Sequence, residues 1–161
     1  MGSVSAAVVS HAHCPVVVVR EENHLTEENK YGPVVVGVDG SDVSQQATEF
    51  AFAEADARGA KIEAIHTWID MQVQASLAGL AAAQQEWKVV EEEQTQLLQE
   101  RLAPLLEQYP NVDVDMVITR DRPIRALVDA AKHAQLLVVG SHGRGGFRGM
   151  LLGSTSRALL Q

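Results

Sequence analysis

Residues 33–41 read PVVVGVDGS, a run of β-branched residues that ends in an acidic, glycine-containing turn. An apolar run without alternating polar residues is typical of a strand buried on both faces, as in a parallel sheet. Ser41 is a suitable N-cap for the following segment, in which apolar residues recur at helical spacing before Gly59. Residues 33–59 therefore predict a strand, a turn and a helix over Asp42–Arg58.

The same alternation of strand and helix patterns extends over the rest of the chain. Helices are expected at residues 77–109, where Gly79 and Pro104 argue against one unbroken helix, and at 124–133 and 154–161. Strands are expected at residues 16–19, 33–38, 62–68, 112–119 (a half-exposed or edge strand) and 136–139. This order predicts an α/β protein with a doubly wound, five-stranded, mainly parallel sheet.

Composition excludes several classes of protein. The 161 residues carry a formal charge of −8, which argues against a nucleic-acid-binding protein. No apolar run approaches the roughly 20 residues that cross a bilayer, and residues 1–10 lack the basic start of a signal peptide. The only cysteine, Cys14, cannot form an internal disulfide. A cytoplasmic protein without a membrane segment is expected.

A glycine-rich loop is the strongest candidate for a site. Residues 139–149 read VGSHGRGGFRG and lie between a predicted strand and a predicted helix. Glycines in this position let backbone N–H groups approach an anion, and residues 120–157 hold seven of the 13 Lys and Arg residues. The loop has neither the Walker A pattern nor G-x-G-x-x-G. It predicts a phosphate site, the alternative being a turn-rich connection without a ligand.

Three motifs together resemble those of the universal stress protein family. The spacing Gly140-x2-Gly143-x9-Gly153-Ser154 resembles its ATP-binding signature, residues 36–41 resemble its first strand, and residues 65–67 resemble the end of its second strand. The resemblance covers about residues 32–161 and is closest to tandem-domain members of actinobacteria. It implies the adenine-nucleotide alpha-hydrolase-like fold and an ATP-binding regulatory module of the stress response.

The resemblance also implies roles for individual residues. Asp39 would lie near the ribose and phosphates or a bound Mg²⁺, and Thr67 would contact adenine through its backbone. Arg144 is left open between pairing with phosphate and lying in solvent. The remaining positions carried over, which would hold ribose and phosphates or line the pocket, are Gly37, Val38, Gly140, Ser141, His142, Gly143, Gly145, Gly146, Gly153, Ser154, Thr155 and Ser156. ATP, with or without Mg²⁺, is the expected ligand.

An internal repeat suggests a permuted arrangement. Residues 2–10 parallel residues 153–161, and residues 11–20 resemble the last strand of the family. On this interpretation residues 1–20 are the helix end and last strand of one domain, 21–31 a linker, and 32–161 a domain without its own last strand. The linker spans at most about 36–40 Å. The last strand would therefore be supplied within the chain or exchanged in a homodimer.

Other functional classes remain as alternatives. A weak ATP hydrolase or another adenine-nucleotide enzyme would use the same fold, but no Walker lysine or positioned catalytic base is recognisable. A dimerisation module without nucleotide is the third interpretation. No catalytic residue is assigned. His66, at the end of a predicted strand, is interpreted as a buried histidine with its hydrogen bonds satisfied.

Overall fold

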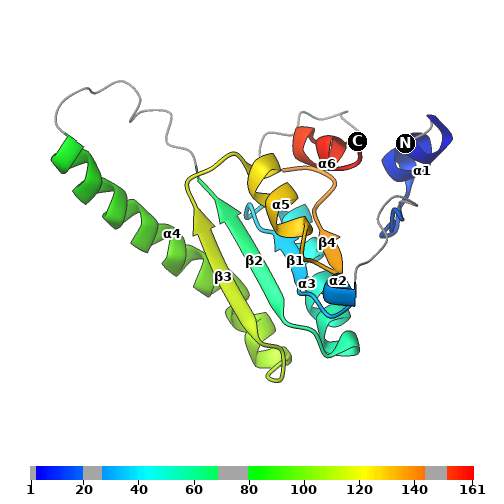
Figure 1. Ribbon diagram of the computed structural model, residues 1–161, viewed down its shortest axis with the longest axis horizontal. Coiled ribbons are helices and arrows are strands. Elements are labelled where there is room, and N and C mark those ends of the chain that lie inside the picture. Colours follow the sequence, from blue (N-terminus) through cyan, green and yellow to red (C-terminus); the bar gives the residue numbers. More distant parts are fainter. Residues whose placement is uncertain (1–2, 20–26, 69–79, 144–151) are drawn as a thin grey trace.

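The computed structural model describes residues 3–19, 27–68, 80–143 and 152–161. Its elements follow one another in the order expected of an α/β chain. They are α1 (Ser3–His11), α2 (Glu27–Lys30), β1 (Val34–Gly37), α3 (Asp42–Arg58), β2 (Ile62–Thr67), α4 (Leu80–Gln108), β3 (Val114–Thr119), α5 (Pro123–Ala131), β4 (Leu136–Val138) and α6 (Ser154–Leu159). The strands form one parallel sheet in the order β3-β2-β1-β4 (Figure 1).

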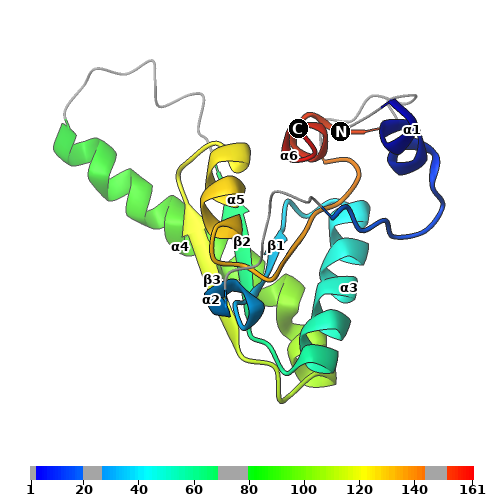
Figure 2. The same ribbon diagram turned by 45° about the vertical axis from the view of Figure 1, so that its right-hand side comes forward.

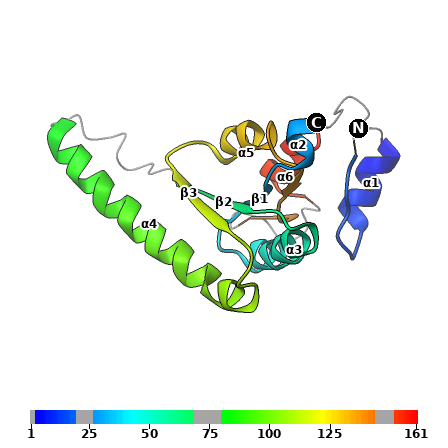
Figure 3. The same cartoon turned by 60° about the horizontal axis from the view of Figure 1, so that its bottom comes forward.

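The sheet is buried between two layers of helices, as the apolar run of β1 predicts. Val34 and Val36 face α3 and α4, whereas Val35 faces α5, and all three side chains are fully buried. Figure 3 shows α3 and α4 on one side of the sheet and α5 and α6 on the other. This alternation follows from the two-residue period of a strand, and the prediction of a doubly covered strand is confirmed.

Helix α3 begins and ends where its capping residues predict. The Ser41 hydroxyl accepts a hydrogen bond from the Ser44 backbone N–H at 3.2 Å. Gly59 adopts the left-handed conformation with φ 60°, and its N–H bonds to carbonyls of the last turn. Both ends are therefore determined by local chemistry. The first cap also fixes the turn between β1 and α3.

Helix α4 corrects the expectation of an interrupted helix, because it continues through Pro104. Three leucines, Leu98, Leu102 and Leu105, are buried against the sheet on both sides of the proline, whereas Pro104 lies on the exposed side. Their packing offsets the backbone hydrogen bond that proline removes. The N-terminal part of α4 extends away from the sheet (Figure 2).

The described sheet has four strands where five were expected. Residues 15–19 carry four valines but form no strand, and the exposed fraction reaches 64% at Val17 and 87% at Val19. A strand is stable only when it pairs with a neighbouring strand, and among the described residues of the single chain this segment pairs with none. β3 does form an edge of the sheet, as its alternating sequence predicts.

None of the helices in the described ranges combines the length and apolar composition needed to cross a membrane.

Candidate functional site

The candidate site lies where the direction of the crossovers changes, between β1 and β4. These strands are neighbours in the sheet. The chain leaves β1 into α3 on one face and reaches β4 from α5 on the other. A crevice forms at such a switch point beyond the carboxyl ends of the strands. The turn after β1 and the loop after β4 are therefore adjacent.

The Asp39 turn, residues 38–41, is held by a compact set of hydrogen bonds. Asp39 Oδ1 accepts from the Ser41 N–H at 2.9 Å and from the Ser41 hydroxyl at 2.7 Å. Ser44, which is buried, accepts from the Asp39 N–H at 3.0 Å and lies 3.3 Å from the Gly37 carbonyl. The two bonds from Ser41 restrain the carboxylate, whereas those of Ser44 restrain the backbone of the turn. Sequence reasoning did not identify Ser44, because its role depends on the tertiary contact with β1.

Residues at the two ends of the region from Gly140 to Ser156 are hydrogen-bonded to each other. The Gly153 N–H donates to the Ser141 carbonyl at 2.7 Å, and the Ser156 hydroxyl donates to that carbonyl at 2.8 Å. A Cβ added to Gly140 would lie 3.2 Å from Val43 Cγ1, so the loop packs tightly on the start of α3. These contacts bring residues 140–143 together with residues 153–156.

The two loops meet at Asp39 and Gly143. A Cβ added to Gly143 would lie 2.5 Å from Asp39 Oδ2, which is closer than side-chain carbons approach an oxygen. The carboxylate therefore occupies space that only glycine leaves free. Asp39, Gly140 and Gly143 thus form one cluster. Of the predicted site residues, Arg144, Gly145 and Gly146 lie outside the described residues.

Thr67 lies at the same edge, at the end of β2, one strand away from the Asp39 turn. Next to it His66 is buried, and its Nδ1 donates to the Val38 carbonyl at 2.6 Å, because a carbonyl only accepts. His66 Nε2 lies 3.0 Å from Gln94 Oε1 of α4. His66 is buried, as interpreted, and each of its ring nitrogens has a polar neighbour within hydrogen-bonding distance. This side chain joins β2, the end of β1 and α4, although no sequence signal marked Gln94.

The basic character of residues 120–157 is partly neutralised on α5. Lys132 Nζ lies 2.6 Å from Asp129 Oδ1, and this hydrogen bond and charge lower the pKa of Asp129. Arg125 Nε lies 3.6 Å from Asp121 Oδ2. These cations are paired with carboxylates on or beside α5. Two of the seven cations counted in residues 120–157, Arg125 and Lys132, therefore lie next to carboxylates of their own.

The described residues contain no group of three or more His, Cys, Asp or Glu side chains arranged to hold a metal ion. In the cluster of Asp39, Gly140 and Gly143, Asp39 supplies the only carboxylate. Its Oδ1 already accepts two hydrogen bonds. Mg²⁺ takes six oxygen ligands in octahedral geometry. Asp39 alone would supply a minority of them, and phosphate and water oxygens would supply the others.

Comparison with known proteins places most of the chain in a family. The model of the universal stress protein family matches residues 30–161. A universal stress protein of Mycobacterium tuberculosis is 47% identical over 160 residues, which are 99% of this chain and 52% of that protein. The chain thus spans about half the length of the curated relatives it matches.

Solved structures agree on the fold. A universal stress protein from Lactobacillus plantarum is 21% identical with a TM-score of 0.65, over 81% of this chain and 90% of that one. A universal stress protein in complex with cAMP is 27% identical, with a TM-score of 0.57 over 81% and 91%. An Archaeoglobus fulgidus universal stress protein in complex with dAMP is 20% identical, with a TM-score of 0.52 over 81% and 90%.

Proposed function

This chain belongs to the universal stress protein family, and from that membership we propose that it is an ATP-binding regulatory module of the cytoplasmic stress response. The observation that carries the proposal is the close approach of Gly143 to the Asp39 carboxylate at the switch point of the sheet. A related protein was solved with cAMP and another with dAMP, so the family includes proteins that hold adenine nucleotides.

The backbone of the two loops supports a phosphate-binding role. Gly140 and Gly143 have no side chains to hold an anion away from the main chain. Ser154 and Thr155 present backbone and hydroxyl donors at the start of α6, next to Gly153, whose own N–H bonds to the Ser141 carbonyl. The Asp39 carboxylate, oriented by Ser41, would accept from the ribose hydroxyls or contact a Mg²⁺ carried by the phosphates. The backbone at Thr67 would pair with adenine.

The first experiment measures what the purified chain holds. Mass spectrometry after denaturation is expected to show an adenine nucleotide at a substantial fraction of the protein concentration, and calorimetric titration of the stripped protein with ATP is expected to show saturable binding. Absence of nucleotide together with no heat on titration with ATP, ADP or cAMP would overturn the proposal. Steady phosphate release from bound ATP that disappears in Asp39→Ala would favour the hydrolase instead.

We also propose that residues 15–19 form the missing strand by pairing with β4 of a second copy. In the described part of the chain, β4 pairs only with β1, so its other edge is available. Four adjacent valines, 37–87% exposed, have the composition of a buried strand. The proposal makes the chain a strand-exchanged homodimer, with residues 21–31 as the linker and 32–161 as the receiving domain.

Light scattering on the 161-residue chain is therefore expected to report about twice the 17.4 kDa monomer mass. Val17→Asp is expected to lower the mass toward the monomer, because a carboxylate cannot enter the apolar interface without a large desolvation cost. Val8→Asp is the matched control, since Val8 is also an exposed valine but lies on α1. A monomeric unsubstituted chain would contradict exchange between copies and favour pairing within one chain.

A further inference from the structure

Arg101 is a cation of α4 that reaches the Asp39 turn. Its neighbours along the helix, Leu98, Leu102 and Leu105, are buried against the sheet, whereas Arg101 is exposed. Its guanidinium lies over Gly40, the residue directly after Asp39. A Cβ added to Gly40 would be 2.5 Å from Arg101 Nη2, so the guanidinium fills the place that a side chain would take.

Gly40 suits this position in two ways. Its φ of 80° lies in the left-handed region, which costs a residue with a side chain free energy. The missing side chain also leaves room for the planar guanidinium against the backbone of the turn. The Asp39 carboxylate faces Gly143, and Arg101 lies on Gly40, which adjoins Asp39. Asp39 therefore lies between Arg101 and Gly143.

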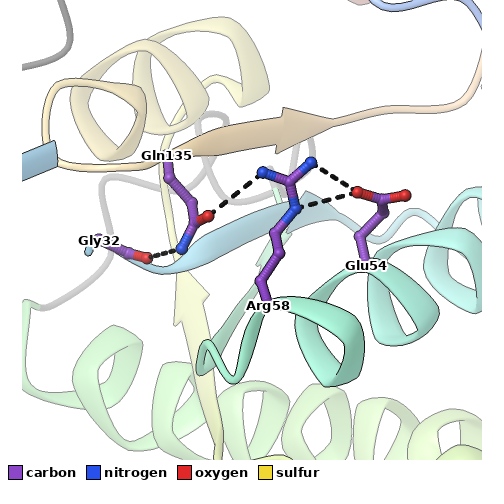
Figure 4. Close-up of polar contacts among 4 residues, drawn as sticks. All are labelled: Gly32, Glu54, Arg58 and Gln135. Atoms are coloured by element: carbon purple, nitrogen blue, oxygen red, sulfur yellow. Dashed lines mark hydrogen bonds and ion pairs between the residues drawn. The ribbon is translucent and has the colours of Figure 1, made fainter. Parts of the chain in front are cut away.

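Among the described residues, the guanidinium of Arg101 has no hydrogen-bonding or ion-pair partner. Arg58 shows the contrast: its Nε and Nη2 bind Glu54 at 2.9 and 2.6 Å, and its Nη1 binds Gln135 at 3.3 Å (Figure 4). Arg101 thus presents donors to an incoming oxyanion without first losing a protein contact.

The space beside Arg101 is open. The side chain lines a groove of about 330 Å³ between α3 and α4. Glu49 is the only carboxylate among the lining residues, and its Oε1 accepts from Gln45 Nε2 at 3.3 Å. An anionic group that extends past the Asp39 carboxylate would therefore meet one cation, Arg101, and one carboxylate, Glu49, in this groove.

We propose that Arg101 is a further ligand-contacting residue of the site and binds the phosphate chain of the nucleotide, an inference that rests on the proposed function. The backbone of Gly140 and Gly143 supplies neutral donors from one side. Arg101 supplies a positive charge from α4 on the other, in the forked geometry that matches phosphate oxygens. Because its effect depends on phosphate charge, Arg101 would favour ATP over nucleotides with one phosphate and over adenosine.

The test compares ATP, AMP and adenosine by calorimetric titration of the unsubstituted chain and of Arg101→Gln, Arg101→Lys and Lys88→Gln. Arg101→Gln is expected to weaken ATP binding about tenfold, to weaken AMP binding less and to change adenosine binding by less than about twofold. Arg101→Lys is expected to retain part of the ATP affinity. Lys88→Gln removes one exposed charge from the same helix and controls for net charge.

The titrations distinguish a failure of the proposed role of Arg101 from a failure of the proposed nucleotide-binding function. Unchanged ATP affinity in Arg101→Gln, with normal binding by the unsubstituted chain, would overturn the role of Arg101 and leave the proposed function intact. An equal loss for ATP and adenosine would also overturn it, because the side chain would then support the pocket rather than the phosphates. If the unsubstituted chain binds none of the three ligands, the proposed function itself fails. Adenosine binding also reports that each variant is folded.

Discussion

Gly143→Ala is expected to weaken ATP binding by at least about tenfold, which corresponds to about 1.4 kcal/mol. The added methyl carbon would lie 2.5 Å from Asp39 Oδ2, so either the carboxylate or the glycine loop must move. Asp39 is restrained by its two hydrogen bonds from Ser41, and Gly140 is packed against the start of α3. Neither loop can relax without disturbing the geometry that the nucleotide requires.

Calorimetric titration with ATP measures this effect, and Gly59→Ala is the matched control. Gly59 caps the C-terminal end of α3, at the other end of that helix from the Asp39 turn, and an added Cβ there has no atom within 4 Å. Its φ of 60° makes the substitution cost about 1 kcal/mol of stability without an effect on affinity. Equal ATP affinity in Gly143→Ala and the unsubstituted chain would contradict the placement of the site between these loops.

Gly32→Ala is expected to destabilise the folded chain by about 3 kcal/mol, at the upper end of overpacking effects. The new Cβ would overlap the carbonyl oxygen of His133 and lie 3.2 Å from the Asn29 carbonyl oxygen. Both obstacles are backbone atoms, which cannot rotate away as a side chain does. The Gly32 carbonyl is itself held by Gln135 Nε2 at 2.7 Å (Figure 4), so the segment entering β1 cannot shift freely.

Chemical denaturation measures this loss as a free energy of unfolding. In thermal denaturation of a chain of this length, 3 kcal/mol corresponds to a fall in Tm of roughly 6–12 °C. Gly59→Ala again serves as the comparison, with about one third of the loss because only backbone conformation opposes it. A loss below about 1 kcal/mol in Gly32→Ala would show that the junction of residues 29–33 with residues 132–135 is looser than the hydrogen bonds across it indicate.

The parts of the fold that sequence predicts correctly are those with local signals. Helix α3 has the predicted bounds, because Ser41 and Gly59 act on their own neighbours in the chain. The strands β1, β2 and β4 lie within the apolar runs that predict them. Pro104 is a local signal that gave a wrong prediction. Proline disfavours a helix locally, but the leucines of α4 pack on strands that are remote in sequence, and this packing outweighs the local effect.

The segment of residues 15–19 shows the limit of composition. Its valines predict a strand, but a strand needs an edge with which to pair, and composition does not say which edge is available. In the single chain the valines are exposed. Whether they complete the sheet of a second copy is a question of association, which the proposed light-scattering experiment addresses.

By itself the sequence determined the kinds of element, their order and the glycine spacing, because β-branched runs, caps and glycines act over a few residues. Only the tertiary structure decided which of these elements became neighbours. The order β3-β2-β1-β4 brings Asp39 against Gly143, and the packing of α4 carries Arg101 to Gly40. These pairs are far apart in the chain, and their contact follows from strand order and helix packing rather than from any local pattern.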